Sequence, residues 1–318
     1  MVSSLTRRQI VLAGAAAPLG WLTGCREDAA SSSAPAPVVR TREATVVLPS
    51  RATMDGAGVR LRRALGHVAL DMLDPFLLLD EFRSDSADDY IRGFPDHPHR
   101  GFETVTYMLQ GAMEHRDSMG NHGRLGPGSI QWMTAGRGII HSEMPKQVSG
   151  LMWGYQLWVN LPARLKMTQP RYQDIVPQAV PEVDGGQARV RVLAGEFGGT
   201  RGPVRDIYTE PLMLDVELRS GAVFSHALPA DHNAFVYSVS GNARVGARGT
   251  SVARGEIAVL GGGDDVQLAA DSEPSRVLLL AGRPLREPVV RRGPFVMNTE
   301  AELQRAFDDY RSGRLVQG

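Results

Sequence analysis

Two short segments of the chain each carry a pair of side chains that can bind a metal ion. His97 and His99 form the first pair, and His141 and Glu143 form the second. Because side chains alternate faces along a β-strand, the two members of each pair would point in the same direction. Two such strands facing one interior could hold an ion with three neutral imidazoles and one carboxylate, a donor set that suits a divalent first-row metal. The spacing therefore predicts a metal centre, and an octahedral ion held there would keep positions open for a chelating substrate or for dioxygen and substrate together.

Other classes of chemistry are not favoured by the sequence. The only cysteine, Cys25, lies close to the N-terminus, so neither a disulfide nor a thiolate site is expected in the folded body. No Ser/His/Asp order and no pair of catalytic carboxylates stands out, so a hydrolase is not favoured. The chain has 35 basic and 35 acidic residues and a formal net charge of zero, so nucleic acid is not an expected partner.

Short β-like runs, separated by Gly, Pro, Asn and Asp, fill the middle of the chain, a pattern that favours a sandwich or a barrel. They include residues 104–109, 154–161, 188–193, 212–218, 235–239 and 276–280. A weak internal repeat relates residues 107–111 to residues 237–241, at an offset of 130 residues. Two copies of one barrel is the simplest account of this repeat.

The last segment has the pattern of a short helix. Thr299 and Glu302 form a capping box at its start. Apolar residues then recur at helical spacing, namely Leu303, Ala306, Phe307 and Tyr310. We expect this helix to pack against a barrel.

The N-terminal segment has the pattern of an export signal. Arg7 and Arg8 precede an apolar stretch that is too short to span a bilayer comfortably. The arginine pair resembles a twin-arginine signal, and residues 22–25 resemble the lipobox of bacterial lipoproteins, in which the cysteine is acylated. We therefore expect lipidation of Cys25 and an exported protein anchored on the periplasmic side of a membrane. The alternative is a buried N-terminal helix with a free thiol.

Four segments resemble motifs of the pirin family of bicupins. Residues 97–107 and 131–145 contain the two ligand pairs, whereas residues 231–237 and 293–299 resemble the family's second-barrel and tail motifs. The resemblance covers about residues 55–315. It implies two tandem cupin barrels, with the metal held in the first one by the two pairs described above. Iron is the usual metal of the family, so Fe(II) is the expected cofactor, with Cu, Ni, Mn and Zn as alternatives.

These features together predict an all-β fold of two tandem cupin (jelly-roll-like) barrels with a short C-terminal helix. The Ala-, Ser- and Pro-rich segment after the signal cannot bury enough apolar surface to fold. The expected divisions are a signal peptide (residues 1–24), a disordered tether (residues 25–44), a metal-binding barrel (residues 45–175), a second barrel without a metal site (residues 176–288) and a tail with the helix (residues 289–318).

Glu103 is an alternative metal ligand. Related single-barrel cupins use a carboxylate four residues after the second histidine, which here is Glu103, whereas pirins do not use that residue. Along an extended strand Glu103 would lie about 13 Å from His99, so it could bind the ion only if the chain turns between them. We favour Glu143 over Glu103.

The resemblance leaves two hypotheses for the function. Some pirin-like proteins cleave flavonols such as quercetin with dioxygen, as quercetin 2,3-dioxygenases, and here Glu143 would act as the catalytic base. Other pirin-like proteins are non-enzymatic, metal-dependent and redox-responsive binding or regulatory modules, whose protein partner the sequence does not identify. The two hypotheses differ in whether a substrate can reach the metal through a cavity.

Overall fold

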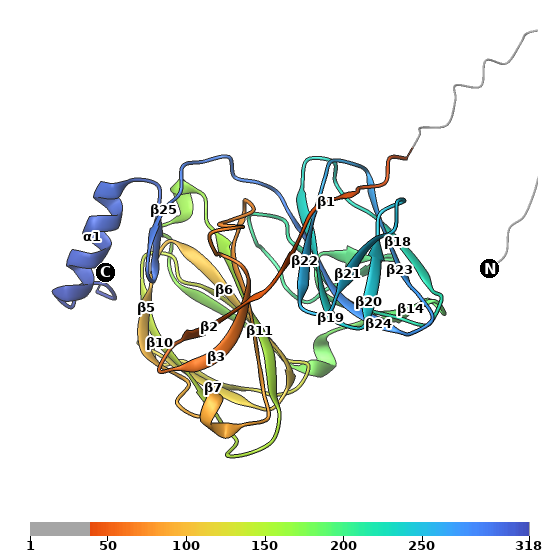
Figure 1. The fold of residues 1–318 in the computed structure, drawn as a ribbon. Coiled ribbons are helices and arrows are strands. Elements are labelled where there is room, and N and C mark those ends of the chain that lie inside the picture. The colour runs from red at the N-terminus through yellow and green to blue at the C-terminus, as the bar shows by residue number, and fades with distance from the viewer. Residues whose placement is uncertain (1–38, 318) are drawn as a thin grey trace, which may run out of the picture. The chain divides into compact units, whose positions relative to one another are not determined.

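Short antiparallel strands make up most of the regular structure in residues 39–317, the part of the chain that the computed structural model describes (Figure 1). The predicted signal peptide, Cys25 and most of the predicted tether lie outside these residues. Within residues 39–317 no helix is long and apolar enough to cross a membrane. The strands form two barrels, each built from one large and one small sheet, as the sequence predicts.

The first barrel pairs a seven-stranded sheet with a four-stranded sheet. In order, the large sheet contains β12 (Arg171–Ile175), β9 (Ile130–Thr134), β6 (Phe102–Gln110), β11 (Met152–Asn160), β4 (Phe76–Ser84), β3 (Val59–Leu65) and β2 (Arg51–Asp55). The small sheet contains β5 (Phe94–His99), β10 (Ile139–Pro145), β7 (Met113–Asp117) and β8 (His122–Leu125). Two short 3-10 helices, η1 (Ala87–Asp89) and η2 (Ala163–Leu165), lie in its connections, and a third, η3 (Pro177–Ala179), leads to the second barrel.

The second barrel repeats this arrangement. Its large sheet contains, in order, β1 (Ala44–Pro49), β22 (Glu256–Leu260), β19 (Asn233–Ser240), β24 (Ser275–Gly282), β17 (Leu212–Leu218), β14 (Ala188–Ala194) and β13 (Glu182–Asp184). Its small sheet contains β18 (Val223–Ala227), β23 (Asp265–Ala270), β20 (Asn242–Val245) and β21 (Thr250–Ala253). The hairpin of β15 (Glu196–Phe197) and β16 (Thr200–Arg201) stands apart. Valine, leucine and alanine side chains fill the space between the two sheets.

The order of the strands confirms the internal repeat. β6 and β19, which contain the two matching segments, are both third in their large sheets, and β9 and β22 are both second. All six runs that the sequence predicts as strands coincide with strands, namely β6, β11, β14, β17, β19 and β24, and only the run 154–161 extends one residue past its strand. Period-two alternation and turn residues were sufficient to predict these elements because both are local properties of the chain.

The two ends of the described chain are exchanged between the barrels. β1 pairs with β22 of the second barrel, although it precedes every strand of the first barrel. This differs from the predicted division, which assigned residues from 45 onward to the first barrel. The predicted tether also ends earlier than expected, because Arg42 is buried and donates hydrogen bonds to the carbonyls of Gly263, His232 and Pro229.

The C-terminal tail returns to the first barrel (Figure 1). It forms the hairpin of β25 (Val290–Arg292) and β26 (Phe295–Met297) and the helix α1 (Glu300–Arg311). The capping box of Thr299 and Glu302 is present as predicted. The tail packs through an apolar cluster that includes Phe295 and Ile140, and Arg100 forms an ion pair with Asp309 at 2.8 Å.

The outer faces of the two large sheets pack against each other. An apolar cluster joins side chains from both sheets, among them Val105 of β6 and Phe235 of β19. Two buried carboxylates add hydrogen bonds across this interface. Tyr237 donates to Glu81 at 2.7 Å, and Tyr107 donates to Asp215 at 2.6 Å. These bonds satisfy groups that would otherwise be costly to bury.

The tail approaches the first barrel closely at Gly101. This glycine has φ of +89°, and a Cβ atom there would lie 1.9 Å from the carbonyl oxygen of Val296. The buried ammonium of Lys166 donates to the carbonyls of both Gly101 and Val296, at 2.8 and 3.0 Å. Only glycine allows this conformation and this approach together.

We predict that Gly101→Ala lowers the free energy of unfolding by about 3 kcal/mol, because it adds backbone strain and forces the tail away from the barrel. Gly120→Ala is the matched control, since Gly120 has φ of +87° and a Cβ atom added there would have nothing within 4 Å. The control should cost about 1 kcal/mol. Chemical denaturation of both variants measures the difference, and equal losses would contradict this account of Gly101.

Candidate metal centre

The three predicted histidine ligands converge inside the first barrel. β5 carries His97 and His99, and β10 places His141 directly opposite His97 in the antiparallel register. One ring nitrogen from each histidine can be chosen so that all three lie within 4.8 Å of one another. The ring centroids are 4.3 to 5.0 Å apart. Three imidazoles at this separation would together be able to hold one divalent metal ion.

The protonation of the histidines suits metal binding. Burial, and then the neighbouring histidines, hold the pKa of His99 and of His141 well below its usual range, so both rings are neutral. Nδ1 of His97 lies 2.8 Å from the carbonyl oxygen of Pro95, so this nitrogen can donate its proton and leave Nε2 with a free lone pair.

The ring nitrogens of His99 and His141 have no hydrogen-bond partner among the described residues, although both rings are buried. Buried polar atoms without partners are rare because they lose their hydration and gain nothing in return. A metal ion would satisfy one nitrogen of each ring. The residues present therefore fit a bound divalent metal.

Glu143 lies on β10 two residues after His141 and is buried. Its Oε1 accepts a hydrogen bond from the hydroxyl of Thr106, and its Oε2 accepts one from the side-chain amide of Gln156, both at 2.7 Å. It is not among the residues whose ligand atoms lie within 4.8 Å of one another. Since a carboxylate has about four lone-pair positions, each oxygen of Glu143 can still accept a proton or a metal bond.

Glu103 faces away from the histidines. Side chains on β6 alternate, so that Thr106 points toward Glu143 while Val105 and Tyr107 join the cluster between the barrels. Glu103 lies on the same face as Val105, where it accepts a hydrogen bond from Thr134 at 2.6 Å. Burial raises its pKa to about 7. The alternative ligand Glu103 is therefore wrong, because the chain does not turn its side chain toward the cluster.

A row of polar side chains crosses the inner face of the large sheet, and the sequence did not predict it. Thr106 of β6 pairs with Gln156 of β11, Gln156 pairs with Asp80 of β4, and Asp80 pairs with Arg63 of β3. Directly paired residues point to the same face of a sheet. The one local signal was Asp80, which together with Glu81 interrupts the apolar run between Leu79 and Phe82.

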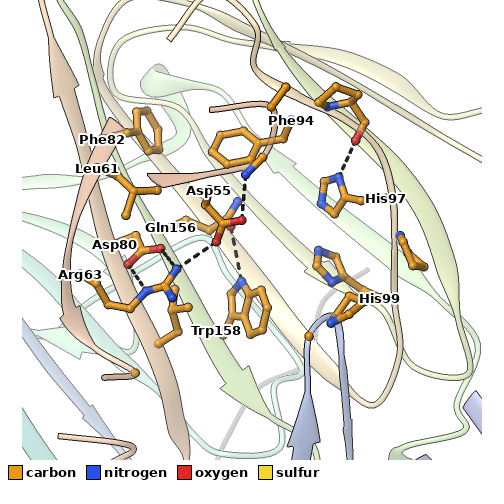
Figure 2. A pocket seen from close by; sticks show the side chains of 18 of the residues that line it. Asp55, Leu61, Arg63, Asp80, Phe82, Phe94, His97, His99, Gln156 and Trp158 are labelled. Carbon is orange, nitrogen blue, oxygen red and sulfur yellow. Dashed lines mark hydrogen bonds and ion pairs between the residues drawn. The ribbon is translucent and has the colours of Figure 1, made fainter. Parts of the chain in front are cut away.

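A cavity of about 670 Å³ opens beside the histidines. Figure 2 shows His97 and His99 on one side and the pair of Arg63 and Asp80 on the other. The apolar lining includes Leu61, Leu78, Phe82, Phe94 and Trp158. Residues 291–294 of the tail complete the wall. The volume is in the range of cavities that bind drug-sized organic molecules.

Comparisons with known proteins agree with this architecture. Residues 58–159 match the family described as Pirin, and residues 213–316 match the family described as Pirin C-terminal cupin domain. A pirin-like protein of Caulobacter vibrioides is 50% identical over 270 residues, which is 84% of this chain and 97% of that protein. A protein of Pseudomonas aeruginosa that is provisionally named a quercetin 2,3-dioxygenase is 46% identical over 88% of this chain and 100% of its own length.

One solved structure extends the comparison to three dimensions. It is the crystal structure of a quercetin 2,3-dioxygenase from Acinetobacter baumannii, which is 32% identical in sequence to this chain. The two structures match with a TM-score of 0.79, over 87% of this chain and 99% of that one.

We predict that His99→Ala abolishes stoichiometric metal binding, because two imidazoles cannot replace the full set. His232→Ala is the matched control, since His232 is also buried and its pKa is also lowered by burial, but it lies in the second barrel. The control should keep one equivalent of Fe(II) after anaerobic loading and gel filtration. Elemental analysis measures the metal content, and a His99→Ala protein with a full equivalent would exclude this centre.

Proposed function

Because the chain belongs to the pirin family of bicupins, we propose that it binds Fe(II) in its first barrel and uses dioxygen to cleave flavonols there. The observation that carries this proposal is the cavity of about 670 Å³ that reaches His97 and His99 from outside. A module that only holds a metal needs no such space, whereas an enzyme must admit an organic substrate to the ion. The names of the relatives support flavonols as the first substrate class to test.

The proposed roles follow from the positions of the side chains. His97, His99 and His141 would hold the ion, and Glu143 is proposed as the fourth ligand. A bound divalent metal supplies Lewis acidity, which lowers the pKa of a chelating flavonol hydroxyl and brings the two reactants together. The apolar lining, with Trp158 beside His99 at a ring distance of 5.3 Å, would bind the flat rings and exclude water.

Glu143 is also proposed to accept the proton of the flavonol hydroxyl. The hydrogen bonds from Thr106 and Gln156 hold its carboxylate in a fixed position. Each oxygen keeps lone pairs for the incoming proton. This arrangement is the positioned base that general-base catalysis needs.

We predict that the Fe(II)-loaded protein consumes dioxygen when quercetin is added. His97→Ala should lose both iron and oxygen uptake, and Glu143→Gln should reduce the turnover rate at least 100-fold, because an amide cannot take up the proton. An oxygen electrode measures the oxygen uptake of both variants with quercetin, and elemental analysis measures their iron content. Iron bound without oxygen uptake would instead favour the non-enzymatic binding module. Full turnover in Glu143→Gln would remove Glu143 from the role of base.

We also propose that the protein is exported and anchored to a membrane through acylated Cys25. The support comes from the sequence, in which Arg7 and Arg8, an apolar stretch and a lipobox-like segment follow one another in the expected order. Two acyl chains would be enough for stable anchoring.

We predict that the protein fractionates with membranes in a bacterial host and that Cys25→Ser releases it, because serine cannot accept the thioether-linked lipid. Metabolic labelling with radioactive palmitate, followed by fractionation, tests both points. An unlabelled wild-type protein in the cytosolic fraction would exclude the proposal, and Ser50→Ala provides a control substitution within the folded body.

A further inference from the structure

The polar row across the large sheet connects the metal side of the cavity with its opposite wall. Thr106 and Gln156 stand at one end and hold Glu143. Asp80 and Arg63 stand at the other end, in direct register with Gln156. Neighbouring strands lie about 4.8 Å apart, so the row from β6 to β3 spans roughly 14 Å. An elongated aromatic molecule that chelates the metal with one end would extend along this row toward Arg63.

Arg63 is held in place but keeps unused donors. Its Nε donates to Asp80 at 2.8 Å, and its Nη2 donates to Asp80 at 2.7 Å and to Asp55 at 3.0 Å. Its Nη1 has no hydrogen-bond partner in the part of the chain that the structure describes. The Arg63 side chain is 22% exposed, and it lines the cavity. Since the guanidinium is already oriented, a ligand can use Nη1 without ordering the side chain.

The ion pair between Arg63 and Asp80 is not explained by stability alone. Asp80 is 5% exposed, and burial raises its pKa to about 6 despite the contact with Arg63. Apolar residues of similar volume often stabilise a protein as well as a buried ion pair does. The surrounding lining includes the apolar side chains of Leu61, Phe82 and Phe94. A charged group retained in such a wall is suited to orienting a ligand.

The balance of charge selects the kind of ligand group. One guanidinium and two carboxylates, those of Asp55 and Asp80, meet at this wall. An acidic ligand group would be attracted by Arg63 but repelled by both carboxylates. Phenolic hydroxyls fit better, because each can accept a hydrogen bond from Nη1 and donate one to the half-exposed carboxylate of Asp55.

We propose that Arg63, held by Asp80 and Asp55, recognises phenolic hydroxyls on the ring that lies farthest from the metal. Arg63 is thereby a residue that determines specificity for hydroxylated flavonols over unsubstituted ones. This inference rests on the proposed flavonol function and names the part of the substrate that the cavity selects. A flavonol that lacks these hydroxyls would leave polar atoms of Arg63 and Asp55 without a partner. A site of this kind discriminates strongly against a ligand that lacks the hydroxyl.

The experiment compares two flavonols that differ only in the pendant ring. Quercetin carries two hydroxyls there, and galangin carries none. Both are titrated anaerobically into the Fe(II)-loaded protein, and quenching of tryptophan fluorescence gives the dissociation constants, with Trp158 in the cavity as the reporter. The wild-type protein should bind quercetin about ten-fold more tightly than galangin. Arg63→Met should weaken quercetin binding about ten-fold and change galangin binding less than two-fold.

Two further variants make the result decisive. Arg63→Lys keeps the charge beside Asp80 but lacks the planar fork, so it should also lose the preference for quercetin, and it decides the question if Arg63→Met does not fold. Arg60→Met is the control on the same strand, since Arg60 is 71% exposed and pairs with Asp89. It should behave as the wild type does.

The possible outcomes separate this inference from the proposed function. Equal weakening of both flavonols in the Arg63 variants would show that Arg63 only shapes the cavity, and the inference would be overturned while the flavonol proposal stands. No binding of either flavonol to the loaded wild-type protein would overturn both proposals.

Discussion

The antiparallel register between β5 and β10 is the constraint on which the whole site depends. It places His141 opposite His97, so that ligands from two segments of the chain meet on one face. A shift of one residue would turn a ligand pair to the outside of the barrel, because the side-chain period of a strand is two. The contacts of Gly101, Lys166 and the tail with the end of β5 oppose such a shift. The packing of the C-terminal tail and the chemistry of the site are therefore parts of one arrangement.

The sequence predicted those parts of the site that depend on local spacing. The pairs formed by His97 with His99 and by His141 with Glu143 follow from strand alternation, and the structure brings the three histidines together as expected. The position of Glu103 required knowledge of which face of β6 is turned inward. The row from Thr106 to Arg63 required the register of four strands, and register is set by contacts between segments far apart in sequence. Only Asp80, a charged residue directly after three leucines, gave a local hint of it.

The predicted divisions of the chain failed where segments cross between the barrels. Propensity and pattern describe an element but do not specify its partner, so β1 was predicted to belong to the barrel that follows it in sequence. Its actual partner is β22, and the buried guanidinium of Arg42 fixes the preceding residues to the second barrel. The two barrels also diverged inside a shared framework. β23 takes the place of β10 in the order of its sheet, yet it gives Val266 and Leu268 to an apolar core.

The exchange of the two chain ends has a consequence for biosynthesis. A growing chain on the ribosome exposes His97 and His99 long before residues 291–294, which complete the wall of the cavity, have been made. In the same way, β1 has no partner strand until β22 has been made. The first barrel lacks part of its cavity wall until the tail has been made, and β1 stays unpaired until the second barrel forms, so folding does not follow a strict domain-by-domain order. The metal pocket is thus completed only after residues 291–294 have left the ribosome.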